Sequence, residues 1–519
     1  MKKTVLILMA LTIVSKLLGF SRDFTLAYFY GASSISDVYL VSLVVPGLLF
    51  GFVAAGISTG YIPMYSKIDH QDGSTEGMDF TNNLLNILFL LCTVIMAIGM
   101  IFTEPIIKVF ASGFEGETLS NAILFTRISL ISIYFTSISY ILSGYLELKN
   151  SFAISAYTGL PFNFFVILFI YMSYKIDFRL LAIGFVLAKF SQALILLIFA
   201  YKKGFAYKPK FNIKDEKIKK MIILAIPVIL GASVTQVNVL VDQTIASRIA
   251  VGGISALNYA STLNTFVLGV FVLTVITVMY PTISKMASQN NMVQLKDVLS
   301  KSINSILLLV IPASIGSMVL AKPIVVFLFG RGAFGDEAIS LTTLAFFFYS
   351  LGLMGFGLRE VLSKVFYSLQ DTKTPMINAA FAMTLNIILN LILSRYLGIG
   401  GLALATSISA IFCSVLLMYS LRKKIGSYGM KDMTKSFAKI LTASMIMGIF
   451  SKVLYGFLIT TVGLTISLLI SVSLSVVVYA LIISFMKIEV VDLFLGELKK
   501  KLINVNKIDP PNSNLRKKA

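Results

Sequence analysis

Tryptophan is absent from the 519 residues, histidine occurs once, cysteine occurs twice, and only 13% of the residues are charged. A soluble chain usually has about a quarter of its residues charged, so this chain has too little polar surface to fold in water. One histidine and two cysteines give no zinc-binding cluster, and no glycine-rich phosphate loop indicates an ATPase. Cys92 and Cys413 fall within apolar runs and are expected to be buried free thiols.

Apolar residues are what the chain has in excess, at 57% of the total. A membrane-spanning helix needs about 20 of them, so fourteen such helices would use roughly 280. Little would then remain for a large extramembrane catalytic domain. Long apolar runs also exclude a disordered chain, a coiled coil and a porin-type barrel, whose strands alternate in polarity. The composition therefore predicts an all-α integral membrane protein with fourteen transmembrane helices.

The apolar runs are separated by short polar loops. We place the fourteen spans at 4–30, 36–65, 81–102, 120–146, 152–173, 179–201, 221–246, 254–283, 302–320, 338–358, 375–394, 399–421, 434–458 and 461–486. The first run follows Lys2 and Lys3 as in a signal peptide. However, Lys16 lies within it and no small-residue cleavage site follows, so we expect a retained first span.

Positive charge is distributed unevenly among the loops. The net charge is +20, from 44 basic and 24 acidic residues. If both termini are cytoplasmic, 31 basic residues lie on the inner side and 8 on the outer side, and the other five sit in or at the ends of spans. Cytoplasmic loops of membrane proteins carry such an excess. The count predicts a multi-pass protein with both termini in the cytoplasm, and it explains the charge without a nucleic-acid partner.

The chain contains an internal repeat. Its matching stretches are Ile35–Ser42 with Ile254–Ser261, Gly60–Lys67 with Val278–Lys285, and Tyr201–Gly204 with Arg422–Gly426. The offset between the paired stretches stays nearly constant, which predicts two parallel six-helix repeats. The predicted parts are a first lobe at 1–204, a basic cytoplasmic linker at 205–220, a second lobe at 221–426, a helix pair at 427–486 and a basic cytoplasmic tail at 487–519. Many transporters use this plan with a substrate site between the lobes; a channel is the alternative.

The first span carries three charged residues, Lys16, Arg22 and Asp23. A charge at mid-span costs about 2.5–3.5 kcal/mol, so these side chains are expected to face a watery cavity or each other. Lys16 and Asp23 are seven residues apart and share a helix face. The alternative is a first span that ends near Leu18, which would leave Arg22 and Asp23 at the outer interface.

Other polar residues mark the second, fourth, sixth and eighth spans. Asp37 opens the second span, either as an interfacial N-cap or as a cavity residue. Asn258 and Thr262, in the eighth span, are the polar counterparts in the second lobe. Arg127 and Lys189 are interpreted as interfacial residues.

Four polar residues of the second lobe could together bind a cation. Asp242 is an acidic residue within the seventh span, Asn386 and Asn390 lie four apart on one face of the eleventh, and Thr406 lies in the twelfth. One carboxylate and a few neutral oxygens suit a hard monovalent cation such as Na⁺. Polar helix packing and a proton on Asp242 are the alternatives.

Several motifs together resemble the MurJ (MviN) family of the MOP flippase superfamily. They are Leu18–Asp23, Ala111–Glu115, Phe125–Ile128, Ala256–Ala260, Leu328–Phe334 and Phe366–Pro375. The resemblance covers about residues 10–430. It implies fourteen helices, a bacterial plasma-membrane location, transport of lipid II, and a final helix pair that forms a groove for the lipid tail. It also implies substrate binding by Arg22, Asp23 and Asp37, and a sodium ion between the seventh, eleventh and twelfth spans.

The sequence departs from the family pattern at several of these positions. Lys16 stands where arginine is usual, which keeps the charge but loses the bidentate fork. Phe50 and Gly51 replace an arginine pair, Ala55 replaces a glutamate, and an arginine expected near Ser261 is absent. These changes leave fewer cations for binding substrate than the family pattern has.

The leading hypothesis is a transporter without enzymatic activity, an alternating-access flippase that moves a polyprenyl-diphosphate-linked peptidoglycan precursor, lipid II, to the outer leaflet. Its expected substrate-binding residues are Lys16, Arg22, Asp23, Asp37, Asn258 and Thr262, and its expected Na⁺ ligands are Asp242, Asn386, Asn390 and Thr406. We expect a monomer among membrane lipids, with no cofactor except Na⁺ as a coupling ion. The alternative is a flippase for another lipid-linked oligosaccharide of capsular or teichuronic type. A cation-coupled drug exporter fits Lys16 and Arg22 poorly, and a glycosyltransferase would need paired carboxylates on a large outer loop.

Overall fold

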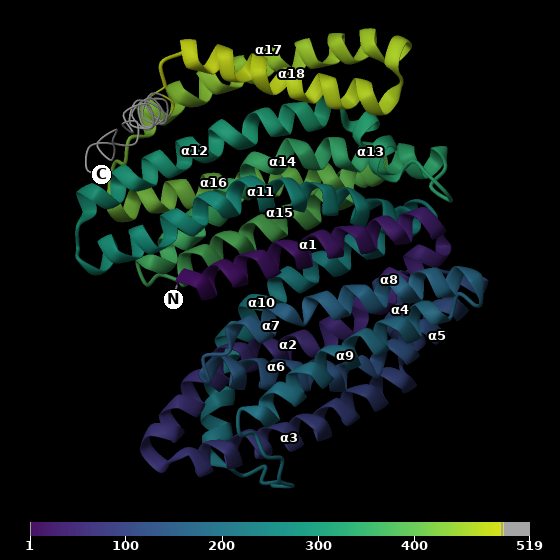
Figure 1. Cartoon of the computed structure of the whole chain (residues 1–519), viewed down its shortest axis with the longest axis vertical. Coiled ribbons are helices and arrows are strands. Elements are labelled where there is room, and N and C mark those ends of the chain that lie inside the picture. The colour runs from purple at the N-terminus through teal and green to yellow at the C-terminus, as the bar shows by residue number, and fades with distance from the viewer. Residues whose placement is uncertain (1, 489–490, 492–519) are drawn as a thin grey trace, which may run out of the picture. The chain divides into compact units, whose positions relative to one another are not determined.

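The computed structural model describes residues 2–488 and 491. Within them the backbone forms eighteen α-helices and no strand (Figure 1). The helices are α1 Lys2–Tyr30, α2 Ser34–Asp72, α3 Ser74–Ile101, α4 Thr103–Phe110, α5 Gly116–Leu130, α6 Ser132–Leu148, α7 Phe152–Tyr157, α8 Gly159–Lys175, α9 Leu180–Lys202, α10 Glu216–Ile249, α11 Gly253–Ser288, α12 Met292–Val319, α13 Ala321–Phe329, α14 Asp336–Ser368, α15 Lys373–Leu397, α16 Ile399–Ile425, α17 Met430–Val462 and α18 Leu464–Phe485. The predicted all-α membrane fold is confirmed.

Twelve of the described segments are long and apolar enough to cross a membrane, and each coincides with a predicted span. The two remaining predictions, 4–30 and 221–246, fall on α1 and α10, which are 29 and 34 residues long. The count of fourteen spans stays a prediction. Several helices are longer than the predicted spans, because the polar residues that follow the apolar runs are also helical. In particular, α2 continues to Asp72 and α11 to Ser288.

Two short helices were not predicted, and they occupy equivalent places in the two repeats. Helix α4 follows α3, and α13 follows α12, at equivalent places in the two copies. Each has a proline at its third position, Pro105 in α4 and Pro323 in α13. Proline fits the first turn of a helix because the amide it lacks has no partner there. Each proline therefore favours the start of a new helix after the preceding span.

The described residues group into two compact units, and the boundary between them passes through α11, α13, α14, α15 and α16. The first unit comprises 1–263, 325–349 and 379–409, and the second comprises 264–324, 350–378 and 410–519. The division of the chain into lobes at 1–204 and 221–426 follows the repeat, differs from this grouping, and stays a prediction.

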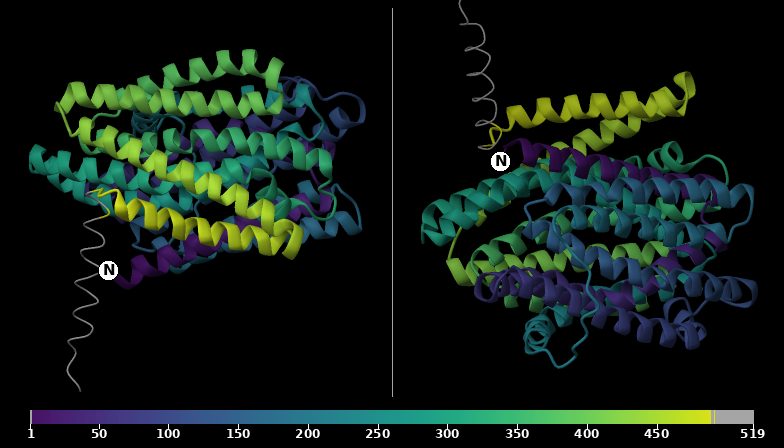
Figure 2. Two further views of the ribbon diagram at one scale, coloured as in Figure 1. Left: turned by 90° about the horizontal axis from the view of Figure 1, so that it is seen from above. Right: turned by 60° about the horizontal axis from the view of Figure 1, so that its bottom comes forward.

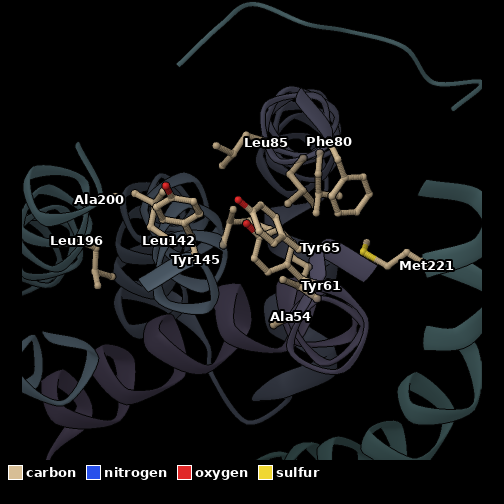
Figure 3. Packing of buried hydrophobic residues seen from close by; sticks show 14 of the residues in the cluster. Ala54, Tyr61, Tyr65, Phe80, Leu85, Leu142, Tyr145, Leu196, Ala200 and Met221 are labelled. Carbon is tan, nitrogen blue, oxygen red and sulfur yellow. The ribbon is translucent and has the colours of Figure 1, made fainter. Parts of the chain in front are cut away.

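The core of the first unit lies between α2, α3, α6, α9 and the start of α10. The rings of Tyr61, Tyr65, Phe80 and Tyr145 gather there, as Figure 3 shows, and the Tyr61 hydroxyl lies 2.9 Å from the Thr81 hydroxyl. Burying each aromatic side chain contributes about 1.5–3 kcal/mol. This cluster therefore fixes α2 against its neighbours.

Small residues on α2 allow close contact with α10. A Cβ atom on Gly56 would lie 2.9 Å from the Ala225 Cβ atom, and one on Gly60 would lie 2.7 Å from the Met221 Cγ atom. Glycine at these positions lets two helix backbones approach closely. Gly56 and Gly60 therefore serve close helix packing, whereas Gly47 has nothing within 4 Å of its Cβ position.

The predicted linker is an extended segment from Phe205 to Asp215 that lies on the first unit. Asn83 accepts a hydrogen bond from the Asn212 amide at 2.6 Å and donates to Asp215 at 3.0 Å. The Lys210 ammonium forms an ion pair with Asp79 and donates a hydrogen bond to it. This hydrogen bond raises the pKa of the lysine. The contacts hold the linker beside the start of α3.

In the second unit, α17 packs on α12 and pairs with α18. The pair is antiparallel and is coloured light green to yellow in Figures 1 and 2. The Tyr479 hydroxyl of α18 donates to the Leu308 carbonyl of α12 at 2.8 Å. The predicted final helix pair is therefore present, attached to α12. Cys92 and Cys413 are buried free thiols, as expected.

Candidate functional site

Arg22 and Asp23 form an ion pair in the middle of α1. The Arg22 guanidinium approaches Asp23 Oδ1 at 2.8 and 2.9 Å, and the Thr262 hydroxyl donates to Asp23 Oδ2 at 3.2 Å. Helix α1 continues to Tyr30, about 12 Å beyond Arg22, and whether the span itself ends near Leu18 stays a prediction. Asp23 is buried and Arg22 is partly exposed. The pair leaves one edge of the guanidinium accessible to a ligand.

Lys16 lies on α1 with the Arg22–Asp23 pair, and Asn258 lies on α11 with Thr262. Lys16 is exposed and forms no ion pair within the described residues. Asn258 is half-buried and has no side-chain hydrogen bond in that part of the chain. Arg22, not Lys16, pairs with Asp23. A free ammonium and a free amide are donors that a phosphate or sugar group could use.

Asp37 has a different environment from the one expected. Its side chain is 1% exposed, and it accepts hydrogen bonds from the Gly252 amide at 2.8 Å and from the Ser255 amide and hydroxyl at 2.7 Å. Ser33, with Ser36, caps the helix that contains Asp37. Asp37 instead caps the first turn of α11, where a carboxylate is favoured by the unpaired amides and the helix dipole. In this conformation its oxygens are occupied.

The two repeats meet around Asp37 through reciprocal backbone contacts. Gly31, at φ +63°, faces the Ala333 carbonyl, and Gly252, at φ +79°, faces the Ala32 carbonyl. The Ala333 amide also donates to the Tyr28 carbonyl at 2.8 Å. Any side chain larger than glycine would occupy the space of these carbonyls. The contact joins the turn after α1 to the turns before α11 and α14.

The four predicted cation ligands lie together in the first unit. Asn390 donates to Asp242 Oδ1 at 2.6 Å and, from the same amide, to Asn386 Oδ1 at 2.8 Å. Asn386 in turn donates to the Thr406 hydroxyl at 3.2 Å, and Asn238 donates to Asp242 Oδ2 at 3.3 Å. The spacing on α10, α15 and α16 therefore brings together all four side chains that the sequence indicated.

Two amide oxygens at this cluster have no hydrogen-bond donor. Asn390 Oδ1 and Asn238 Oδ1 are buried and unpaired, although nearly all buried polar atoms in proteins have partners. Turning the Asn390 amide over would direct its oxygen towards Asp242, and amide orientation is set by the surrounding network. A cation beside Asp242 would supply what these oxygens lack. No group of three His, Cys, Asp or Glu residues exists among the described residues, which disfavours a divalent site.

At two positions, Phe50 and Lys189, the structure shows surroundings that bear on the cations expected from the sequence. Phe50, which stands where the resembled family has an arginine, is 1% exposed and packs near the Tyr140 ring. Lys189, which was interpreted as interfacial, lies near the middle of α9 and above the Phe162 ring, 4.9 Å from its centroid. No sequence signal separated Lys189 from an interfacial lysine.

Comparisons of the sequence with known proteins all identify relatives from one family. The family model described as lipid II flippase MurJ matches residues 26–474. The probable lipid II flippase MurJ of Vibrio cholerae is 32% identical over 430 residues, which are 80% of this chain and 82% of that protein. The corresponding protein of Thermotoga maritima is 32% identical over 482 residues, which are 92% of this chain and 95% of that one.

Solved structures show the same likeness. The lipid II flippase MurJ in an inward closed conformation superposes with a TM-score of 0.80 at 26% identity, covering 93% of this chain and 98% of that chain. An inward-facing multidrug resistance MATE family transporter of the MOP superfamily has a TM-score of 0.69 at 14% identity, over 81% of this chain and 98% of that chain. The second likeness is one of fold alone.

Proposed function

The chain belongs to the lipid II flippase MurJ family, and we propose that it moves lipid II from the inner to the outer leaflet of the bacterial plasma membrane. The observation that carries this proposal is the family match over residues 26–474. The match to an inward closed structure over nearly the whole chain agrees with it. The protein acts as a transporter and changes no covalent bond of its substrate.

In this proposal the diphosphate of lipid II is bound beside Arg22. A guanidinium donates two parallel hydrogen bonds to a phosphate, and such charge-assisted bonds are stronger than neutral ones. Asp23 positions the guanidinium through the bonds at 2.8 and 2.9 Å. Lys16 adds a second charge, and Asn258 offers its amide to the sugar or phosphate oxygens. Thr262, whose hydroxyl donates to Asp23, can accept a hydrogen bond from a sugar hydroxyl. Asp37 acts by holding the outer contact closed while the substrate enters from the inner side.

The same proposal includes a topology. Fourteen spans result if α1 and α10 cross the membrane together with the twelve segments that are apolar and long enough. An even number places both termini on one side, and the excess of basic residues in the loops favours the cytoplasm. The lobes at 1–204 and 221–426 would alternate around the substrate, α17 and α18 would contact its lipid tail, and one chain would suffice.

The test is complementation in a bacterium whose own lipid II flippase can be depleted. Expression of this chain should restore growth and should restore access of an externally added lipid II-binding probe to its ligand. Arg22→Ala should abolish both effects at normal membrane levels, and Arg179→Ala, which changes an arginine that is 60% exposed, is the matched control. Failure of the wild-type chain, or accumulation of a different lipid-linked precursor, would favour another oligosaccharide as substrate.

We also propose that Asp242, Asn386, Asn390 and Thr406 hold a sodium ion. The unpaired Asn390 oxygen and the single carboxylate support a monovalent cation. The ion would neutralise Asp242 and link α10 with α15 and α16. Polar helix packing explains the hydrogen bonds equally well, but it leaves the two amide oxygens without donors.

Thermal unfolding in NaCl and in KCl at equal ionic strength tests the sodium site. NaCl should raise the unfolding temperature of the wild type relative to KCl, and Asp242→Asn should remove the difference. Asp177→Asn changes an exposed carboxylate and should keep it. Equal stability of the wild type in both salts, or a sodium effect that survives in Asp242→Asn, would contradict the proposal. A response to pH without a response to sodium would indicate a proton on Asp242.

A further inference from the structure

Lys189 and Arg22 lie at the same depth in the first unit. Tyr30, at the end of α1, contacts the end of α8 through the 2.7 Å hydroxyl contact with Ser173, and α9 begins shortly after that end. Arg22 is eight residues before Tyr30, and Lys189 is nine residues after Leu180. At 1.5 Å per residue these are distances of about 12 and 13.5 Å. The two cations therefore occupy one level of the helix bundle.

Two aromatic rings surround the Lys189 ammonium, and no acidic side chain among the described residues forms an ion pair with it. Its ammonium lies 4.9 Å from the Phe162 ring centroid and 5.8 Å from that of Phe185. Within the described residues it forms no ion pair and no hydrogen bond. Asn163, next to Phe162 in α8, donates to the Ser15 carbonyl of α1 at 3.3 Å. The helix whose Phe162 ring lies beside Lys189 therefore packs directly against α1. A Cβ atom on Gly19, three residues before Arg22, would lie 3.9 Å from Asn163 Oδ1, so the part of α8 beside Lys189 also lies beside the part of α1 that precedes Arg22.

An unpaired lysine at mid-helix is unfavourable in a membrane protein unless it faces water or an anion. Two aromatic faces offset part of that cost. Arg22 does not help, because like charges repel. Asp23 balances the charge of Arg22, but in this conformation no acid balances Lys189. Without a ligand, the uncompensated charge of Lys189 therefore destabilises the folded protein. An anion placed between Arg22 and Lys189 would remove the repulsion between the two cations.

We propose that Lys189 is a third cation of the substrate site and binds an ionised phosphate oxygen of the diphosphate linkage. This inference rests on the proposed function. Lys16, Arg22 and Lys189 with Asp23 carry a net charge of +2, three positive charges less one negative. A diphosphate that is esterified at both ends carries two negative charges at neutral pH, one on each phosphate. The three cations and Asp23 therefore match the charge of a lipid-linked diphosphate.

Three variants separate this role from simple packing. Lys189→Met keeps the length and apolar stem but removes the charge, and Lys189→Arg keeps the charge. Lys202→Met is the matched control, because Lys202 lies on the same helix, 5.4 Å from the Phe199 ring centroid, but at the exposed end. A lysine that only packs between rings would tolerate methionine better than arginine. A phosphate-binding lysine would tolerate arginine better than methionine.

Binding of purified lipid II to each detergent-solubilised protein is the measurement. Lys189→Met should weaken binding about tenfold or more, while Lys189→Arg and Lys202→Met should stay within about threefold of the wild type. Polyprenol without the diphosphate should bind equally to all variants, and inorganic diphosphate, added as a competitor, should displace lipid II more weakly from Lys189→Met. Unfolding temperatures identify a misfolded variant, in which case folded Lys189→Gln replaces it.

The outcomes distinguish the two proposals. Unchanged affinity of Lys189→Met or Lys189→Gln for lipid II, or a loss confined to Lys189→Arg, overturns the role of Lys189 and leaves the proposed function intact. If the wild type does not bind lipid II but binds another diphosphate-linked lipid in a manner that depends on Lys189, the substrate is wrong and the role of Lys189 is supported.

Discussion

At the scale of single residues, Asp37 shows how one carboxylate can join distant parts of the chain. Its three donors come from Gly252 and Ser255, which lie in the other repeat. A hydrogen bond to a charged group contributes about 1.5–3 kcal/mol. The sequence indicated that Asp37 was special, but the partner could not be predicted because so much of the chain separates the two. The sequence suggested that Asp37 caps its own helix, α2, whereas in the structure Asp37 caps α11.

Replacing Asp37 tests whether this contact holds the outer end closed. Asp37→Asn keeps the size but has one acceptor oxygen, so either Gly252 or Ser255 loses its acceptor. The ratio of closed to open molecules should fall about tenfold or more, which corresponds to the loss of one such bond. Labelling of Ser36→Cys by a membrane-impermeant thiol reagent should become faster, since Ser36 is fully buried beside Ser255. Glu117→Gln, in the first turn of α5, is the control, and equal labelling in both variants would contradict the role.

Gly31 offers a second test of the same contact, with a control built into the fold. Gly31 and Gly73 both have positive φ, at +63° and +90°, so alanine at either position strains the backbone by about 1–3 kcal/mol. Only at Gly31 would the new Cβ atom meet another part of the chain, the Ala333 carbonyl, whereas Gly73 has nothing within 4 Å. We expect Gly31→Ala to open the outer contact and raise thiol labelling of Ser36→Cys, and Gly73→Ala to leave labelling unchanged. Similar labelling would show that strain alone matters.

At the scale of elements, the turn between α14 and α15 is tied to the end of α16. Asp371 accepts hydrogen bonds from Lys424 at 2.6 Å, from the Thr374 amide at 3.0 Å and from the Thr374 hydroxyl at 2.9 Å. Burial raises the pKa of Asp371, but the hydrogen bonds from Lys424 and Thr374 together outweigh burial and lower the pKa to about 2. The carboxylate therefore stabilises the fold in its ionised form.

This tie should give a defined pH dependence. Because the folded pKa lies below the unfolded value of about 3.9, the stabilisation is present above pH 4 and is lost as the pH falls towards 2. Its upper limit is about 2 kcal/mol, and screening by water reduces it. Asp371→Asn should lower the unfolding temperature at pH 7, and the difference from the wild type should shrink between pH 4 and pH 2. Asp297→Asn, which removes an exposed pair with Lys301, should change little at any pH.

At the scale of the whole molecule, the parts of the fold that follow from local pattern were predictable. Apolar length located the helices, and the constant offset located the repeat. The cation cluster was also predictable, because Asp242, Asn386 and Asn390 are unusual residues inside apolar runs. Lys189 was not, since its neighbouring rings belong to ordinary membrane residues and only tertiary packing brings Arg22 near. The contact around Gly31 likewise depends on an approach of two backbones, which leaves no mark in the sequence except glycine.

Orientation in the membrane is the property of the whole molecule that the charges predict most directly. With 31 basic residues on one side and 8 on the other, the side with 31 should face the cytoplasm. A reporter fused after Ala519 should be active only in its cytoplasmic form, and one inserted in the loop at 330–336 only in its external form. Insertion into the 205–215 linker is the control for the inner side. Because eight spans are predicted after the linker, an external reporter after Ala519 together with an internal linker would mean that one of those eight is missing, and α10 would be the first helix to examine.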